Sequence, residues 1–508
     1  MALPDWVTRA DQPVTVEVPE LFGPLVLDSD QDVPTFGLLI GGRWQPARTG
    51  EVFDVSSPID GSLIARAQQG GSEDVEAAIA SARDARAEFR SMPAAERLAI
   101  CERAGEILGS NDEAVASAIV VNLGKTGEQA QSEVKATRMR LELVREEVRK
   151  IFGEYLPGDW ISDTAGKSGV VLREPVGTVA AVGPFNYPLF LAASKIIPAL
   201  AAGNTVVAKA PSADPIPLLM FARVMEEAGL PAGALNVITG PGGEMGEQLA
   251  SHPDVSMVSF TGSTSAGHKM AAAAVAKPIH MELGGNAAAL VLSDADLDTA
   301  VEKCVLGAFN NAGQRCDAIS RVLVEDAVYD AFVERAVKEA ETWPVGDPRA
   351  EGVRVGPMVS DSEAARVNDL VEDAAGKGAT VLVGGQAADA YHQPTVLADV
   401  PLDAEIVWEE TFGPVLTVVR VDDVEHALEV ANRSRYGLDS AVFTSDLEKA
   451  WYAARALECG QVTVNDAPKH GVGHFPFGGR KPDSGIGREG LGYSIDECTV
   501  LKTVVLPD

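Results

Sequence analysis

Residues 176–210 read VGTVAAVGPFNYPLFLAASKIIPALAAGNTVVAKA. The pattern predicts a short apolar strand, a helix that ends at a glycine, and a second apolar strand. Further strand and helix patterns alternate in the same way up to residue 283. Repeated strand–helix–strand units require right-handed crossovers, and these build a parallel sheet that helices cover on both faces. The sequence therefore predicts an α/β fold.

Polar residues and glycines gather where these predicted strands end. Asn186 follows the first strand of the quoted stretch, Lys209 ends the second, and Glu282 ends the run KPIHMEL. Ligands of open parallel sheets bind at the carboxyl ends of the strands. We therefore expect these side chains to line one site at that edge of the sheet.

The composition argues against several kinds of partner. With 74 acidic against 42 basic residues the net charge is −32, which disfavours binding to nucleic acid or to an anionic membrane. Two explanations of this charge stay open, a halophilic-type, salt-adapted surface and the acidic product of a high-GC gene. The five cysteines form no CxxC pair and no metal-ligand spacing, so we expect free thiols, no metal and a reducing compartment.

No segment is expected to direct secretion or to cross a membrane. The N-terminus has no apolar core after a basic start, which is unlike a signal peptide. The most apolar stretch, residues 189–208, is interrupted by Lys195, Pro198 and Asn204. A buried helix and strand explain this stretch better than a membrane span. We expect a cytoplasmic protein.

Two glycine-marked turns carry groups that suit acyl chemistry on a carbonyl. Cys316, in NNAGQRCDA, stands beside Arg315, and a helix starting there would stabilise its thiolate together with that charge. A buried, inert cysteine is the alternative. Glu282 is either paired or tuned as a base, because a carboxylate at a buried strand end is rarely a solvated charge. Asn186 supplies an amide that can hold an oxyanion, or it is simply a turn residue.

The segment FTGSTSAG, residues 260–267, indicates a nucleotide site. It closes a strand and opens a helix, so its free N–H groups and the Ser263 hydroxyl suit a pyrophosphate. The segment is not the GxGxxG fingerprint, and by itself it leaves the ligand open. Lys209 would reach a ribose or phosphate hydroxyl, with a lone surface lysine as the alternative.

Taken together, the motifs resemble the aldehyde dehydrogenase superfamily from about residue 37 onward. In chain order they are PFNYP, the lysine in VVAKAPS, FTGST, ELGG, GQRC, EETFGP and FPFGG. The resemblance implies NAD(P)-dependent oxidation of an aldehyde to a carboxylate. It also implies a Rossmann-like cofactor domain, an α/β catalytic domain and a β oligomerisation extension.

The resemblance assigns catalytic roles as well. Cys316 would attack the aldehyde to give a thiohemiacetal, whose oxyanion the Asn186 amide and the Cys316 backbone N–H would hold. Hydride transfer to the nicotinamide would leave a thioester, and Glu282 would activate the water that hydrolyses it. Transfer to the thiol of coenzyme A is an alternative that Glu282 disfavours. A catalytically silent member of the superfamily would be expected to lack the cysteine or the glutamate, and this chain has both.

The cofactor contacts implied by the resemblance are Lys209, Ser212, Gly262, Ser263, Gly267, Leu283, Glu410 and Phe412. Glu410 and Phe412 would clamp the nicotinamide ribose, and Lys209 and Ser212 would face the adenosine ribose. Many NAD-preferring members carry glutamate at the Ser212 position. A serine removes the charge that repels a 2′-phosphate, so we expect NADP, or both NADP and NAD, as cofactor.

The resemblance also indicates which small-molecule aldehyde is the substrate. GQRC, ELGGN and the C-terminal FPFGG region are most similar to non-phosphorylating, archaeal-type glyceraldehyde-3-phosphate dehydrogenases, where the positions of Arg315 and Tyr187 help to bind the phosphate. Ala136 and His470 stand where that group has arginines, with His470 still a substrate contact and Arg138 a candidate substitute. Glyceraldehyde 3-phosphate is the lead substrate. The alternative is a small unphosphorylated aldehyde or semialdehyde, such as lactaldehyde or succinate semialdehyde.

At 508 residues and 53.2 kDa the chain exceeds one ordinary core. The expected parts are an N-terminal acidic arm (1–35), a cofactor-binding domain (36–150 and 172–283), a catalytic domain (284–482) and an oligomerisation extension (151–171 and 483–508). The last part rests on the terminal run TVLKTVVL, because a final strand with no later partner often completes a sheet in another subunit. We expect a homodimer or homotetramer.

Overall fold

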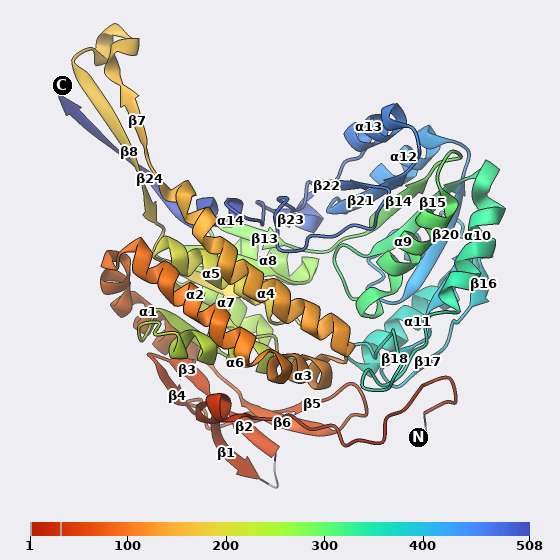
Figure 1. Ribbon diagram of the computed structural model, residues 1–508, viewed down its shortest axis with the longest axis horizontal. Helices are drawn as coiled ribbons and strands as arrows, with labels where there is room; N and C mark the ends of the chain where they lie inside the picture. The colour runs from red at the N-terminus through yellow and green to blue at the C-terminus, as the bar shows by residue number, and fades with distance from the viewer. Residues whose placement is uncertain (1–2, 31–32, 508) are drawn as a thin grey trace.

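The computed structural model describes residues 3–30 and 33–507, which form two α/β units and a projecting β arm (Figure 1). The first unit holds an eight-stranded sheet in the order β23-β13-β12-β9-β10-β11-β3-β4. Its strands are β3 (Leu38–Ile40), β4 (Arg43–Gln45), β9 (Thr178–Val182), β10 (Thr205–Lys209), β11 (Leu235–Ile238), β12 (Met257–Thr261), β13 (Ile279–Glu282) and β23 (Gly485–Ile486). Strands β9 to β13 pair in parallel, which confirms the α/β prediction.

Alternate residues of the central strand β9 point into different cores. Val179 and Ala181 pack with helices on one face, and Ala180 and Val182 pack with helices on the other. Because both faces are buried, the strand is apolar throughout. The helices of this unit are α1 (Ser72–Ser91), α2 (Ala94–Ser110), α3 (Asp112–Leu123), α4 (Gly127–Glu147), α5 (Phe190–Ala202), α6 (Ile216–Glu227), α7 (Gly242–Ser251) and α8 (Thr264–Ala273).

The N-terminal segment differs from the arm that we expected over residues 1–35. A small sheet in the order β1-β2-β6-β5 includes two of its strands. Phe22 and Leu25 are fully buried beside α6, so the segment covers a core and does not simply lie on the surface. The strands are β1 (Val26–Asp30), β2 (Val33–Phe36), β5 (Val52–Ser56) and β6 (Leu63–Gln68). Residues 1, 2, 31 and 32 of the expected arm lie outside the described residues.

The second unit is built on a seven-stranded sheet in the order β16-β19-β20-β15-β14-β21-β22. Its strands are β14 (Ala287–Val291), β15 (Ile319–Glu325), β16 (Thr380–Val383), β19 (Thr395–Ala398), β20 (Val415–Val421), β21 (Asp439–Phe443) and β22 (Gln461–Val464), with a separate hairpin of β17 (Ala387–Ala388) and β18 (Tyr391–His392). Its helices are α9 (Leu297–Phe309), α10 (Asp326–Ala340), α11 (Asp361–Gly376), α12 (Val424–Asn432) and α13 (Leu447–Ala456). The chain crosses from the first unit to the second between β13 and β14.

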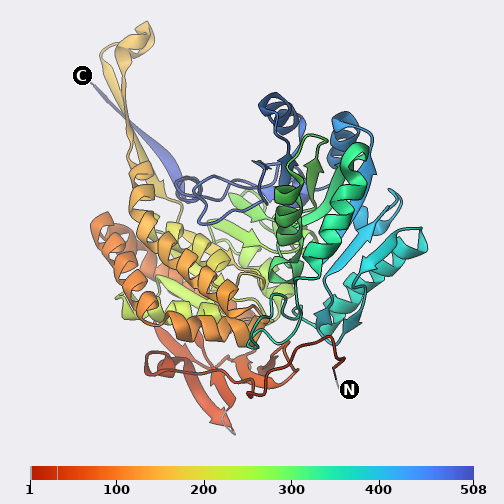
Figure 2. The ribbon, with the colours of Figure 1, turned by 45° about the vertical axis from the view of Figure 1, so that its right-hand side comes forward.

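The third part is an arm that extends away from both units (Figures 1 and 2). Its strands are β7 (Glu154–Pro157), β8 (Lys167–Pro175) and β24 (Thr499–Pro507), in the order β24-β8-β7, and α14 (Tyr493–Glu497) leads into the last one. The terminal run is a strand, as predicted, and it pairs antiparallel with β8 of its own chain. The outer edge of β24 has no strand beside it within the described residues. Pairing of that edge with another subunit stays a prediction.

Within the described residues no helix is long and apolar enough to span a membrane. The apolar stretch that raised the question forms α5, which is buried along its whole length, and strand β10. This confirms the expected buried helix and strand.

Candidate active site

The loop that joins the two units begins after Glu282 and passes close to the turn that carries Cys316. Glu282 is the last residue of β13, and Gly284 and Gly285 lead on toward β14. A Cβ atom at Gly285 would lie 1.9 Å from the backbone oxygen of Cys316. The glycine is therefore required, because only a bare backbone can pass so close to the Cys316 loop.

Cys316 lies in a turn between the short helix η5 (Asn310–Gly313) and strand β15. The expectation of a helix beginning at Cys316 is wrong, because the chain enters a strand there. Cys316 therefore does not stand at a helix N-terminus that could stabilise its thiolate. The bend has another cause: Asn311, Ala312 and Gly313 have φ angles of 55°, 52° and 70°, so three successive residues are left-handed.

Asn186 is held beside this turn by side-chain and backbone contacts. Its side-chain Nδ2 donates to the Gln314 carbonyl at 2.9 Å, and its own carbonyl accepts from Asn311 Nδ2 at 3.3 Å. An amide Nδ2 carries two hydrogens, so one remains for a ligand oxygen. The structure thus brings the predicted amide and the predicted thiol to the same loop.

Glu282 is buried among other ionisable groups. Its Oε1 lies 3.7 Å from His280 Nε2, which is also 3.5 Å from Glu489 Oε2. Glu489 in turn pairs with Lys195 at 3.0 Å. Burial raises the pKa of Glu282 to about 8, against the opposing charge of His280. A carboxyl group with such a pKa can exchange protons near neutral pH.

His280 connects this buried cluster with helix α14, which leads into the C-terminal strand β24. Its Nδ1 lies 2.7 Å from Oε2 of Glu497, whose side chain is 28% exposed. Burial opposes the charge of His280, but the contacts with Glu489 and Glu497 outweigh it and raise the pKa of His280 to about 9. His280, Glu489 and Glu497 were not predicted from the sequence. The buried ion pair of Lys195 could have been predicted, because a lysine inside an apolar helix pattern needs a buried partner.

His470, predicted as a substrate contact, lies beside Cys316, the predicted nucleophile. Its Nε2 is 2.9 Å from Asp439 Oδ2, and its imidazole lies beside the Cys316 thiol. The ring also stacks on Phe477 with a centroid distance of 3.8 Å and an interplanar angle of 4°. Asp439, at the start of β21, was not singled out from the sequence.

The predicted phosphate-binding residues have partners inside the protein. Arg315 Nη2 donates to Asp317 Oδ2 at 2.8 Å and to the Pro468 carbonyl at 3.1 Å. Tyr187 lies under Lys125, whose Nζ is 3.4 Å from the ring centroid. The candidate substitute Arg138 packs against Gly109 of helix α2, where a Cβ would lie 2.7 Å from its guanidinium carbon.

Lys209 and Ser212 meet at the carboxyl end of β10. Lys209 Nζ donates to Ser212 Oγ at 3.0 Å, and this hydroxyl donates to the Gly240 carbonyl at 2.7 Å. Burial lowers the pKa of Lys209 to about 8. Ser263 is the N-cap of α8, its Oγ accepting from Ala266 N, and Gly262 directly precedes it. A cation beside hydroxyls and a helix N-terminus are groups that fit the phosphates and ribose of a dinucleotide.

Glu410 and Phe412 lie on the other side of the joining loop. Glu410 Oε1 accepts from the Gly285 N–H at 2.8 Å, and burial raises the pKa of Glu410 to about 7. Phe412 has a φ of 48° and packs edge-on against Phe185 at 5.9 Å. Leu283 packs onto Gly267, where a Cβ would lie 2.3 Å from a Leu283 methyl carbon. These predicted cofactor residues therefore share one region with the loop that joins the two units.

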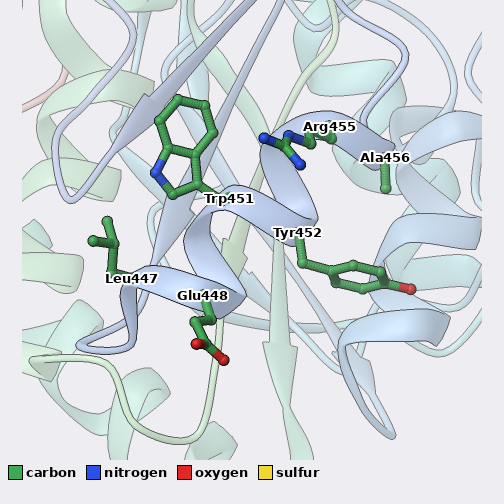
Figure 3. A pocket seen from close by; sticks show the side chains of 6 residues that line it. All are labelled: Leu447, Glu448, Trp451, Tyr452, Arg455 and Ala456. Carbon is green, nitrogen blue, oxygen red and sulfur yellow. The ribbon is translucent and has the colours of Figure 1, made fainter.

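A separate surface hollow of about 610 Å³ lies on helix α13. Figure 3 shows Trp451 and Tyr452 projecting from that helix. Trp451 is 59% exposed and Tyr452 is 50% exposed. None of the predicted site residues lines this hollow. It is a different surface from the region around Cys316.

Comparison with known proteins agrees with this geometry. The aldehyde dehydrogenase family model matches residues 44–504, and the chain belongs to that family of NAD(P)-dependent oxidoreductases. The 3-sulfolactaldehyde dehydrogenase of Priestia megaterium is 37% identical over 93% of this chain and 98% of its own length. The NADP-dependent succinate-semialdehyde dehydrogenase of Escherichia coli is 36% identical over 91% and 96%. The NADP complex of the Bacillus halodurans NADP-dependent glyceraldehyde-3-phosphate dehydrogenase superposes with a TM-score of 0.91, at 36% identity over 93% and 99%.

Proposed function

We propose that Cys316 is the nucleophile of an aldehyde oxidation that ends in hydrolysis. The thiolate adds to the aldehyde carbon, and the resulting oxyanion is held by the Asn186 Nδ2–H and the Cys316 backbone N–H. A nicotinamide bound beside this carbon would supply the acceptor for its hydride. A thioester on Cys316 then remains.

Glu282 completes the cycle in this proposal. Its carboxylate takes a proton from water, the hydroxide adds to the thioester, and the carbon–sulfur bond breaks to release the carboxylate product and the thiolate. The observation that carries the proposal is the contact between the joining loop and the Cys316 carbonyl, with the Asn186 amide tied to the same turn. These contacts support a shared site for thiol, amide and carboxylate.

For the substrate we propose a short aldehyde whose tail is uncharged or carries one negative charge, such as a carboxylate or sulfonate. Arg315 forms an ion pair with Asp317, and both hydrogen bonds described for it leave from Nη2. Its Nε and Nη1 still offer N–H groups to one acceptor. Arg138 packs away against Gly109, and Ala136 has no polar group. This favours the alternative substrate class over the phosphate dianion of glyceraldehyde 3-phosphate.

We propose NADP as the preferred cofactor, with NAD also used. Ser212 is exposed and holds no charge, while Lys209 beside it is a cation that can pair with a 2′-phosphate. We further propose that the arm joins subunits. Leu501 and Val505 of β24 are 62% and 63% exposed, and burying them against another copy would remove apolar surface from water.

The test measures NAD(P)H formation in high salt and phosphate-free buffer. Succinate semialdehyde, 3-sulfolactaldehyde, lactaldehyde and glyceraldehyde 3-phosphate would each be offered with both cofactors. We expect kcat/KM for at least one of the first three to exceed that for glyceraldehyde 3-phosphate by about tenfold or more, which is about 1.4 kcal/mol. A preference for glyceraldehyde 3-phosphate would contradict the substrate proposal.

Cys316→Ala should abolish oxidation and keep NADP binding, with Cys304→Ala as the matched control that keeps activity. Cys304 is buried in α9, away from the turn that carries Cys316. Residual oxidation by Cys316→Ala would contradict its role as nucleophile.

A further inference from the structure

A buried histidine–aspartate pair stands against the proposed nucleophile. His470 Nε2 is 2.9 Å from Asp439 Oδ2, and the Asp439 side chain is fully buried. Since Nε2 is used by Asp439, Nδ1 is the nitrogen left for the Cys316 thiol. Phe477 stacks on the ring and fixes its plane. Nothing in the proposed cycle above uses this arrangement.

The electrostatic surroundings favour a charged imidazole. Burial opposes the charge, but the Asp439 carboxylate raises the pKa of His470 well above its usual range, and Asp317 acts in the same direction. Burial raises the pKa of the Cys316 thiol to about 11, while His470 acts to lower it and the Asp317 and Asp439 charges act to raise it. Arg315 also faces this cluster, but it is paired with Asp317. His470 is therefore the cation that the thiol directly contacts.

We propose that His470, held in place and kept charged by Asp439, is the counter-ion of the Cys316 thiolate in this enzyme. This role rests on the proposed function of Cys316 and adds a catalytic residue to it. It differs from the sequence reading, in which His470 contacts the tail of the substrate. Asp439 acts through His470 and is a positioning residue.

The proton balance of the step is simple. The thiol loses its proton to water or buffer, and the thiolate that remains forms an ion pair with the imidazolium. No atom is oxidised or reduced. When the thiolate adds to the aldehyde carbon, the negative charge moves from sulfur to the carbonyl oxygen, where the Asn186 amide can accept it. His470 is then free to pair with the thiolate again when the thioester is cleaved.

The contact also explains why Cys316 needs a cation from elsewhere in the chain. The turn after Cys316 leads into strand β15, so Cys316 does not stand at a helix N-terminus. The neighbouring Arg315 is occupied by Asp317. A thiolate is the reactive form of cysteine, and a histidine cation is one of the environments that stabilise it.

The test measures thiolate formation without any substrate or cofactor. The full-length protein would be alkylated with iodoacetamide from pH 5 to pH 10, and the rate at Cys316 read by mass spectrometry of its peptide. Cys316→Ala gives the background from the other four cysteines. For His470→Gln we expect the rate at pH 7.5 to fall by roughly tenfold or more, which corresponds to a rise of about one unit in the pKa of the thiol. His470→Arg keeps a cation and should restore much of the rate.

Asp439→Asn is the second variant, and it protects the test against misfolding of His470→Gln. With its carboxylate removed, the imidazole should lose its proton at lower pH. The loss of the His470 charge should outweigh the loss of the weaker, opposing Asp439 charge on the thiol, so thiolate formation should again move to higher pH. His426→Gln, a histidine on α12 outside this cluster, is the matched control and should leave the profile unchanged.

An alkylation profile that stays the same in both His470→Gln and Asp439→Asn would overturn the proposal. If His470→Gln instead raises KM for charged aldehydes without moving the alkylation profile, His470 binds the substrate tail and the proposal is equally overturned. Failure of the proposed dehydrogenase function is distinguishable, because it would show as missing NAD(P)H formation whatever the alkylation profile.

Discussion

The backbone of Gly285 touches the carbonyl oxygen of Cys316, so closely that a Cβ on Gly285 would lie 1.9 Å from that oxygen. Gly285 also donates its N–H to Glu410 Oε1 at 2.8 Å. One glycine thus links the loop that carries Glu282, the turn that carries the thiol and a predicted cofactor residue. Relative placement of the reacting groups depends on this contact, and displacements of about 1 Å can cost about 100-fold in rate.

Gly285→Ala should therefore separate the two loops. We expect a loss of about 1–3 kcal/mol in the free energy of unfolding, as for other added carbons in packed sites, and a fall in kcat/KM of roughly 100-fold or more. Urea unfolding and NAD(P)H formation measure the two effects. Gly376→Ala is the control, since a Cβ there meets nothing within 4 Å. Equal behaviour of the two variants would show that the contact does not matter.

The pH dependence of turnover should report Glu282. Burial raises its pKa to about 8, and only the ionised form can take a proton from water. With hydrolysis of the thioester as the slow step, kcat should rise with pH and level off above pH 8. A kcat that is constant from pH 6 to pH 9 under these conditions is incompatible with Glu282 as the base.

The raised pKa of Glu282 also makes the stability of the fold depend on pH. A pKa raised from 4.5 in the unfolded chain to about 8 in the fold disfavours the ionised form, so the contribution of Glu282 to stability is full below pH 4.5 and falls as the pH rises through 8. Glu282→Gln removes the ionisation. Its melting temperature relative to the unchanged protein should therefore increase between pH 5 and pH 9, as measured by calorimetry.

His280 should tune this base. Its charge, 3.7 Å from Glu282, favours the carboxylate and so acts to lower the pKa of Glu282. In His280→Gln the limb of the kcat profile should move to higher pH, because that charge is lost. His426→Gln again serves as the control. An unmoved limb would mean that His280 is neutral when Glu282 acts.

Cofactor choice should follow position 212. Ser212→Glu places a carboxylate 3 residues from Lys209, at the position of the present contact between Lys209 Nζ and Ser212 Oγ. We expect KM for NADP to rise by about tenfold or more through charge repulsion, with KM for NAD little changed or lower. Steady-state kinetics with both cofactors measures the ratio. An unaltered ratio would place the 2′-phosphate elsewhere.

The parallel sheet and the site at its edge could be predicted from the sequence, because each rests on local patterns. Buried strands such as β9 are continuous apolar runs, and Asn186 and Lys209 directly follow or end such strands. The shape around Cys316 could not be predicted in this way. Three left-handed residues before it turn the chain into a strand, where a local pattern suggested a helix.

Contacts between residues that are far apart in the sequence could not be predicted either. Asp439 and His470 are 31 positions apart, and neither stands near Cys316 in the sequence. Arg315 stays a predicted substrate contact, but its ion pair with Asp317, two residues away, could not be predicted from the motif alone. The partners and pKa values of these charged groups depend on their burial. Tertiary packing, which a local pattern does not reveal, decides whether a loop residue is buried.

The most direct test of the central claim uses Glu282→Gln in a single rapid-mixing experiment with substrate and cofactor in excess. We expect one burst of about one NAD(P)H per subunit, followed by a rate at least about 100-fold below that of the unchanged protein. At the end of the burst, mass spectrometry should find the acyl group on the Cys316 peptide. Steady turnover without a burst, or a burst with no acyl group on Cys316, would contradict the assignment of these two residues.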